Sequence, residues 1–316
     1  MNTVFQVILL IIGFAMLIKG ADIFVDASVN IARWLKIPSV IIGLTIVAMG
    51  TSAPEVVIGI VASAGGSSDM AVGNVLGSNI FNLMFIVGIC AMIKPIALRF
   101  KEFAKDYWLS VAVPVALLIV MFLLDDYIPR IGGVILVLVF ITYMTLLVRQ
   151  GMKKRVVENE PETEAPPVSL TKNIFLGLLG LALIIVGAQF AVSSAESLAQ
   201  TLGISERVIG ITVIAVGTSL PELVIFLISS KKGENEMAIG VIIGSNVFNI
   251  LFVLGISGIV MPLAIDGSMK IDLAVLIAGK LAFLLFSLTN KKITRLEGLV
   301  FSLMYVGYIA FTFIVL

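Results

Sequence analysis

Two glutamates lie inside apolar stretches of the chain, each beside hydroxyl groups and a proline. Glu55 ends the motif GTSAPE, which begins at Gly50, and Glu222 ends the motif GTSLPE, which begins at Gly217. A carboxylate at the centre of a membrane helix costs about 2.5–3.5 kcal/mol on insertion scales. Such costly groups usually mark function, so these two motifs are the first candidates for chemistry.

A second polar motif follows each glutamate, as GSNIFN after Glu55 and as GSNVFN after Glu222. Residues four apart share one face of a helix, which aligns Ser78 with Asn82. The same spacing aligns Thr51 with Glu55, with Ser52 at the edge of that face. The second copy repeats both alignments, so each half offers hydroxyl, amide and carboxylate oxygens.

The two prolines add backbone oxygens to this set. A proline inside a helix removes one backbone donor and leaves a carbonyl one turn earlier without its helical partner. We therefore expect the carbonyls near Ala48 and Ala215 to be available as ligands, and we expect the glycines to loosen the same turns. The predicted helix-breaking residues are Gly50, Pro54, Gly217 and Pro221.

All of these candidate ligands are oxygen atoms, which suit hard cations such as Ca²⁺ and Na⁺ better than zinc or copper. Two glutamates supply the charge that balances one Ca²⁺, and no basic residue recurs beside them. The predicted metal-binding residues are Ala48, Thr51, Ser52, Glu55, Ser78, Asn82, Ala215, Thr218, Ser219, Glu222, Ser245 and Asn249, with Glu55 and Glu222 at the centre.

The alternative is that these residues are architectural. A single proline kink is more often a structural feature than a site, Ser and Thr often bond to their own helix, and small residues often mark packing contacts. Recurrence of Pro, Glu and hydroxyls in register with a second polar motif favours a binding site.

The composition is that of a membrane protein. The chain has 316 residues, of which 59% are apolar and 13% charged, and its mean hydropathy is +1.15. Histidine is absent, and the single cysteine, Cys90, excludes an internal disulfide. Ten apolar runs are long enough to cross a bilayer: 3–20, 39–64, 70–93, 107–124, 131–149, 172–190, 207–230, 237–261, 271–288 and 297–316. The predicted fold class is an all-α polytopic membrane protein, and the N-terminus lacks the basic region of a signal peptide.

The chain contains an internal duplication. An offset of 167 residues places Gly50 on Gly217, and 22 of the 46 positions from Gly43 to Gly88 are identical to their copies. Five predicted spans in each half, an odd number, predict an inverted-topology repeat with interrupted helices 2, 3, 7 and 8 around a site at the midplane. The expected divisions are a first half at 1–150, a polar cytoplasmic linker at 151–169 and a second half at 170–316.

The basic residues predict the orientation. With the N-terminus outside, the cytoplasmic loops of the ten-span topology hold sixteen Lys and Arg residues and the outer loops hold three. The positive-inside rule then places both termini outside and the 150–170 loop in the cytoplasm of a cell membrane.

Three further charged residues in the spans do not belong to the repeated set. Asp22 and Asp26 have Gln189 and Ser193 as their copies, so pairing with Lys19 or Asn30 is the expected role. Lys280 falls in the middle of the ninth span and is expected to reach the interface or to pair with an interior acid. The KKGENE stretch at 231–236 is expected to be a solvated loop end.

Together, the paired GTSxPE and GSNxxN motifs in two halves of five spans resemble the α-repeats of the sodium/calcium exchangers, within the calcium/cation antiporter superfamily. The resemblance covers nearly the whole chain and is strongest over 43–88 and 210–255. It implies that Glu55 and Glu222 hold Ca²⁺ and, in the alternate state, Na⁺, with the hydroxyls, amides and carbonyls named above as further ligands. It also implies that the first and sixth spans slide as a gating bundle.

Two departures from the family's pattern matter. Some members carry Asp where this chain has Asn249, so the amide argues against K⁺ co-transport. The large cytoplasmic calcium-sensing domains of animal exchangers are also absent, which fits a short-loop prokaryotic member.

The resulting hypothesis is a secondary antiporter, not an enzyme, that exchanges Na⁺ for Ca²⁺ by alternating access. It is expected to need no cofactor or nucleic acid and to work as a monomer in the bilayer. A proton/calcium exchanger of the same superfamily is the main alternative. An intramembrane hydrolase using the two glutamates is disfavoured because the chain lacks histidine and the HExxH and GxSxG motifs.

Overall fold

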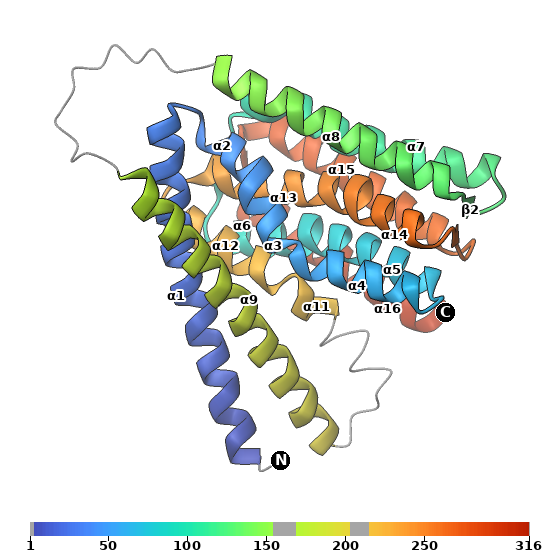
Figure 1. Cartoon of the computed structure of the whole chain (residues 1–316), viewed down its shortest axis with the longest axis horizontal. Helices are drawn as coiled ribbons and strands as arrows, with labels where there is room; N and C mark the ends of the chain where they lie inside the picture. Colours follow the sequence, from blue (N-terminus) through green and yellow to red (C-terminus); the bar gives the residue numbers. More distant parts are fainter. Residues whose placement is uncertain (1–2, 154–168, 203–214, 316) are drawn as a thin grey trace. The chain divides into compact units, whose positions relative to one another are not determined.

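The computed structural model describes residues 3–153, 169–202 and 215–315 (Figure 1). Most of the predicted 151–169 linker and the first residues of the predicted 207–230 span lie outside these ranges. The described residues form two compact units, and each unit contains segments from both halves of the sequence. Unit 1 comprises residues up to Thr51 and 143–240, and unit 2 comprises 52–142 and 241 onwards. The division of the sequence into halves at 1–150 and 170–316 stays a prediction.

The first half of the chain begins with a long helix and a chain of shorter ones. Its elements are α1 (Thr3–Leu35), α2 (Ser39–Ile42), the π-helical η1 (Gly43–Val47), α3 (Ala48–Thr51), α4 (Ala53–Ala64), α5 (Ser68–Ile80), the π-helical η2 (Phe81–Ile86), α6 (Val87–Ile93), β1 (Ile96–Ala97), α7 (Phe100–Leu123), β2 (Tyr127–Ile128) and α8 (Arg130–Lys153).

The second half repeats this order closely. Its described elements are α9 (Leu170–Thr201), α11 (Ala215–Thr218), α12 (Leu220–Lys231), α13 (Asn235–Phe248), the π-helical η4 (Asn249–Val253), α14 (Leu254–Val260), β3 (Leu263–Ala264), α15 (Met269–Asn290), β4 (Lys292–Ile293) and α16 (Arg295–Val315). The bounds of α3, α4 and α6 recur 167 residues later as those of α11, α12 and α14, so the duplication read from the motifs extends to the secondary structure.

Seven of the described helices are long and apolar enough to cross a membrane, and an eighth qualifies if Ser39–Thr51 and Ala53–Ala64 form one broken span. The chain is therefore a multi-span membrane protein. The helix that contains the first predicted span continues beyond residue 20 to Leu35. The helix that contains the sixth predicted span continues beyond residue 190 to Thr201. Both helices carry polar residues beyond the apolar run, and hydropathy alone stops there.

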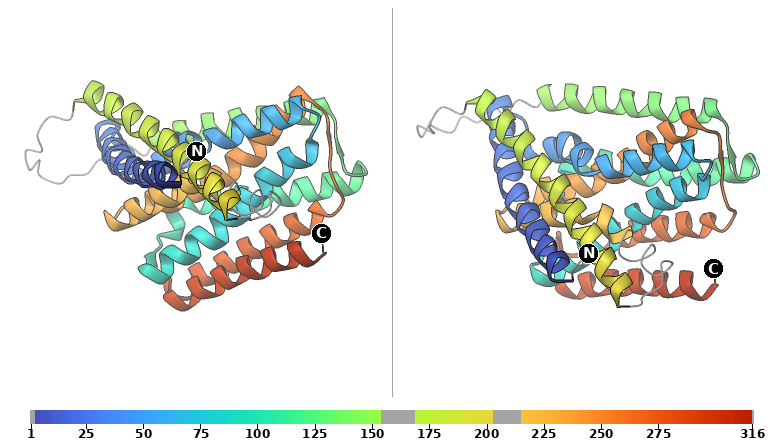
Figure 2. Two further views of the ribbon diagram at one scale, coloured as in Figure 1. Left: turned by 90° about the horizontal axis from the view of Figure 1, so that it is seen from below. Right: turned by 60° about the horizontal axis from the view of Figure 1, so that its bottom comes forward.

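Within unit 1, α1 and α9 run side by side, as both views of Figure 2 show. Glycines bring the two backbones into contact. A Cβ on Gly13 would lie 2.8 Å from the carbonyl oxygen of Gly187, and a Cβ on Gly20 would lie 2.8 Å from that of Gly180. Small residues that allow close helix approach are the usual basis of packing in membranes.

Within unit 2, contacts occur in pairs related by the duplication. β1 pairs with β4 and β2 pairs with β3, both antiparallel. Phe81 stacks on Phe85 beside Tyr305, and the copies Phe248 and Phe252 stack in the same way beside Phe140. Exchange of the two halves maps each contact onto its partner, which is the relation that a two-fold axis produces.

The predicted interruptions fall into two kinds. The second predicted span breaks at Ser52 between α3 and α4, and the seventh breaks at Ser219 between α11 and α12, with a proline in the first turn of each following helix. The third and eighth spans do not break, which corrects the prediction. They contain the π-helical segments η2 and η4 instead, in which an extra residue is accommodated without ending the helix.

Candidate cation-binding site

Unit 2 brings the first glutamate to a residue of the second polar motif. Glu55 lies in the first turn of α4 and is completely buried, and Ser78 lies on α5. The Ser78 hydroxyl donates a hydrogen bond to Oε1 of Glu55 at 3.3 Å. A carboxylate near a helix N-terminus is also stabilised by the helix dipole. This pairing confirms that the two motifs of the first copy meet in space.

The amides of the second motif form a buried network in the same unit. Asn79 donates from Nδ2 to the backbone carbonyl of Asn246 at 3.1 Å, and Asn249 donates from Nδ2 to Oδ1 of Asn79 at 3.1 Å. Asn79 and Asn246 are copies of each other, 167 residues apart. The two GSN motifs therefore lie against one another.

Several buried polar atoms around this network have no hydrogen-bond partner among the described residues. They are Nδ2 and Oδ1 of Asn82, Nδ2 and Oδ1 of Asn246, and Oδ1 of Asn249. A buried acceptor without a partner costs about 1–3 kcal/mol, so unsatisfied groups in a native interior call for an explanation such as an ion or water. The oxygens of Asn82 and Asn249 are of the type that Ca²⁺ and Na⁺ bind.

Unit 1 holds six of the predicted ligands. The hydroxyl of Thr51 donates to the carbonyl of Ala48 at 3.2 Å, so this carbonyl is used within its own turn and keeps one lone pair. Ser219 and Glu222 are completely buried, and the Ser219 hydroxyl has no partner among the described residues. Ala215 begins α11, and its side-chain environment lies outside the described part.

The break at Ser52 corrects the argument that aligned Thr51 with Glu55. That argument assumed one continuous helix, whereas α3 ends at Thr51 and α4 begins at Ala53.

The predicted ligands divide between the two units. Unit 1 contains Ala48, Thr51, Ala215, Thr218, Ser219 and Glu222, and unit 2 contains Ser52, Glu55, Ser78, Asn82, Ser245 and Asn249. A single site made of both sets stays a prediction.

The glycines before the breaks have a packing role that the sequence did not predict. Neither Gly50 nor Gly217 adopts a positive φ. A Cβ on Gly50 would lie 3.1 Å from Leu181 of α9, and one on Gly217 would overlap Val192 of the same helix. These glycines therefore provide close packing of α3 and α11 against α9.

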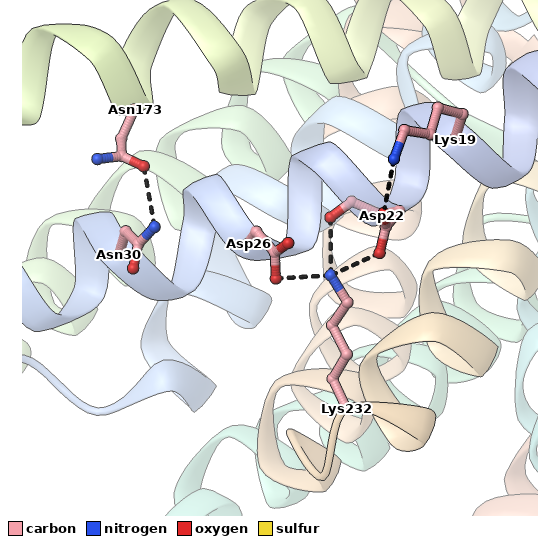
Figure 3. A network of polar contacts seen from close by, with 6 residues as sticks. All are labelled: Lys19, Asp22, Asp26, Asn30, Asn173 and Lys232. Atoms are coloured by element: carbon pink, nitrogen blue, oxygen red, sulfur yellow. Dashed lines mark hydrogen bonds and ion pairs between the residues drawn. The ribbon is translucent and has the colours of Figure 1, made fainter.

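The charged residues of α1 form an ion-pair network that the sequence revealed only in part (Figure 3). Lys19 pairs with Asp22 at 3.1 Å, as expected. Lys232, just after α12, lies 2.7 Å from Asp22 and 2.6 Å from Asp26, which corrects the expected partners of Asp26 and the reading of this lysine as a solvated loop end. Asn30 bonds to Asn173 of α9 instead.

Lys280 is buried on α15 and does not reach an interface. Its ammonium donates to the Ser110 hydroxyl of α7 at 3.2 Å, and its backbone carbonyl accepts a hydrogen bond from Tyr107. No acid pairs with it among the described residues, which corrects both expectations for this lysine.

Sequence reasoning missed Asn79 and Asn246, although both belong to the GSN motifs. The helical spacing used to choose ligands selects Ser78 with Asn82 and passes over the residue between them. The available signal was that Asn79 and Asn246 are identical in the two copies.

A family model supports the same assignment over most of the chain. The model described as "Sodium/calcium exchanger protein" matches residues 5–149 and 172–314. The two matched segments flank the predicted linker.

Relatives of comparable length are also found. CaxA of Alkalimonas amylolytica is 41% identical over 311 residues, covering 95% of this chain and 96% of CaxA. The sodium/calcium exchanger MaX1 of Methanosarcina acetivorans is 32% identical over 342 residues, covering 97% of this chain and 98% of MaX1. A solved structure of the sodium-calcium exchanger NCX_Mj, soaked with Na⁺ and Ca²⁺, has a TM-score of 0.84 and 32% identity, covering 97% of this chain and 98% of that one.

Proposed function

Because the chain belongs to the sodium/calcium exchanger family of transmembrane antiporters, we propose that it exchanges Na⁺ for Ca²⁺ across the membrane by alternating access, without K⁺. The observation that carries this proposal is the set of buried oxygens in unit 2. Unit 2 buries the carboxylate of Glu55 and the Ser78 hydroxyl that donates to it, and it also buries the amide oxygens of Asn82 and Asn249, which have no hydrogen-bond partner among the described residues.

The chemistry of this cluster favours a mobile hard cation. A carboxylate buried among membrane helices is expensive as a bare charge. A cation offsets that charge and also satisfies the amide oxygens that have no partner in the part of the chain that the structure describes. Glu222 is the buried copy of Glu55 in unit 1, and two carboxylates match the charge of one Ca²⁺.

Exchange follows if both cations use the same carboxylates. A site whose charge is not neutralised crosses an apolar barrier only at high cost, so the empty site does not change sides. Na⁺ and Ca²⁺ then move in opposite directions through one site. The names of MaX1 and NCX_Mj, which are exchangers of these two ions, support this choice.

Asn249 supports independence from K⁺. Its position is neutral, and its amide nitrogen is engaged with Asn79. An additional monovalent cation would require additional negative charge, which an amide does not supply.

The proposed topology has ten helices in two inverted repeats, with both termini outside. The protein is proposed to act as a monomer.

The direct test uses purified protein in vesicles, with Na⁺, K⁺ and H⁺ gradients imposed separately while Ca²⁺ flux is recorded. We expect flux with the Na⁺ gradient alone. Glu55→Gln and Glu222→Gln should each abolish it, whereas Glu297→Gln should not, because Glu297 caps α16 through Thr294. Ca²⁺ flux driven by a pH gradient without Na⁺ would instead establish the proton-coupled alternative, and flux retained in both glutamate variants would refute the assigned roles.

A further inference from the structure

Each GSN motif contains an asparagine that the proposed cation site does not use. Asn79 is completely buried and Asn246 is 1% exposed. Together with Asn82 and Asn249 they form two pairs of copies within unit 2, which we call the asparagine quartet.

The hydrogen bonds fix the orientation of two members of the quartet. The backbone carbonyl of Asn246 can only accept, so Asn79 must present its Nδ2 to that carbonyl. The Oδ1 of Asn79 then faces Asn249, which must present its own Nδ2. As a result, Oδ1 of Asn249 is turned away from Asn79, and it has no hydrogen-bond partner among residues 3–153, 169–202 and 215–315. Asn79 thus sets which atom of Asn249 is available to a ligand.

The duplication defines a counterpart for each of these bonds. Exchange of the halves turns the bond from Asn79 Nδ2 to the Asn246 carbonyl into one from Asn246 Nδ2 to the Asn79 carbonyl. It turns the bond from Asn249 to Asn79 into one from Asn82 Nδ2 to Asn246 Oδ1. Neither counterpart is formed. The three side-chain atoms that the counterparts need are Nδ2 and Oδ1 of Asn246 and Nδ2 of Asn82, and within the described part of the chain all three lack partners.

We propose that the asparagine quartet is a two-state hydrogen-bond switch in which Asn79 and Asn246 are positioning residues. In the present state Asn79 holds Asn249 and exposes its oxygen. In the other state Asn246 holds Asn82 and exposes the oxygen of that residue. The proposal rests on the proposed alternating access.

The physical basis is that one set of hydrogen bonds is formed while its counterpart set, related to it by exchange of the halves, is not formed. We call this counterpart set the mirror set and the conformation that would contain it the mirror state. Unpaired buried amides are costly, and here their partners lie in the same network. In an inverted repeat, exchange of the halves corresponds to exchange of the two sides of the membrane. The conformation open to the opposite side should therefore carry the mirror set of bonds.

The test measures the apparent Ca²⁺ affinity from each face of the protein, in right-side-out and inside-out vesicles, and takes the ratio of the two. Asn79→Leu removes only the bonds of the present state, and Asn246→Leu removes only those of the mirror state. We expect the ratio to change by roughly threefold to tenfold in opposite directions, the range set by about one net hydrogen bond. The double variant should return to within about twofold of the parent ratio.

Two further variants keep the test decisive. Asn79→Asp keeps the acceptor for Asn249 but loses the donor to Asn246, so it should shift the ratio in the same direction as Asn79→Leu but less. Asn74→Val is the control, because Asn74 lies on the same helix and its copy is Val241. It should leave the ratio unchanged.

The outcomes separate the switch from the function it rests on. Shifts in the same direction, or no shift in variants that fold and transport, would overturn the switch, since a purely structural role has no sidedness. A parent protein without Na⁺-driven Ca²⁺ flux would overturn the proposed function instead.

Discussion

The hydroxyl of Ser78 on α5 donates a hydrogen bond to Oε1 of Glu55 on α4 at 3.3 Å, in a completely buried setting. The two residues lie 23 positions apart and come from the two different motifs of the same copy. A hydrogen bond to a charged group is worth about 1.5–3 kcal/mol. This bond orients the carboxylate that the proposed site depends on.

The Ser78 hydroxyl should therefore contribute to cation affinity. We expect Ser78→Ala to weaken the apparent Ca²⁺ affinity by roughly tenfold or more, as loss of a charge-assisted bond predicts, and Ser78→Thr to retain most of it. Ser63→Ala is the matched control, because Ser63 is buried on α4 and its hydroxyl has no partner among the described residues. Equal losses in the Ser63 and Ser78 variants would contradict a ligand-related role.

The neutral amide of Asn249 should make exchange insensitive to K⁺. Replacing K⁺ by an organic cation is expected to leave Ca²⁺ flux of the parent protein unchanged. Asn249→Asp should lower the flux, because a carboxylate cannot donate a hydrogen bond to Oδ1 of Asn79, so a carboxylate oxygen and an amide oxygen, both acceptors, would face each other. Flux measurements in vesicles test both points, and a K⁺ requirement in the parent would contradict the first.

The buried amino group of Lys280 should make Ser110 more important to stability than Lys280 itself. Ser110→Ala leaves this buried polar group without its acceptor and should lower the free energy of unfolding by about 1–3 kcal/mol. Lys280→Met removes the polar group and keeps the volume, so it should be neutral or stabilising. In the double variant the Ser110→Ala change should cost little. Thermal unfolding in detergent measures all three, and an undiminished cost in the double variant would show that the bond is not responsible.

The ion pairs of Lys232 should give a modest, salt-dependent stability. We expect Lys232→Met to lower the free energy of unfolding by about 1 kcal/mol, because such partly exposed pairs are individually weak. The control for loss of charge is Lys231→Met, at the exposed neighbouring position. The difference should shrink in about 1 M salt, where the screening length falls to about 3 Å.

The pH dependence of this contribution follows from the pKa of Lys232. Burial lowers that pKa, but the hydrogen bonds to Asp22 and Asp26 and their negative charges raise it by more than burial lowers it. The pKa of Lys232 therefore lies above its ordinary value of 10.5. A raised pKa means stability that is fully present below pH 10.5 and lost as the pH rises through the folded-state pKa. The difference between Lys232→Met and the parent should therefore be constant across neutral pH.

The sequence predicted the parts of the fold that depend on composition and recurrence. Apolar runs located the helices, and the prolines located the breaks at Ser52 and Ser219. The full length of α1 was missed because its last turns carry polar residues such as Asp22 and Asp26. The π-helical segments were also missed, since an extra residue in a helical turn leaves no compositional signal.

The candidate site was predictable by residue type and less so by geometry. Glu55, Ser78 and Asn249 were chosen for their oxygens, and the structure buries all three. The role of Asn79 depends on a contact between residues 167 positions apart, which spacing along one helix cannot reveal. The contact between Lys232 and Asp22 could not be predicted for the same reason, because the two residues lie 210 positions apart.

The strand pairs have a consequence for how the protein is made. β1 pairs with β4 and β2 pairs with β3, so each short strand of the first half of the chain pairs with a strand from the second half. Gly88 of α6 likewise packs against Gly298 of α16. While only the first half has been synthesised, the partners of β1, β2 and Gly88 do not yet exist, so unit 2 closes only after α16 has left the ribosome.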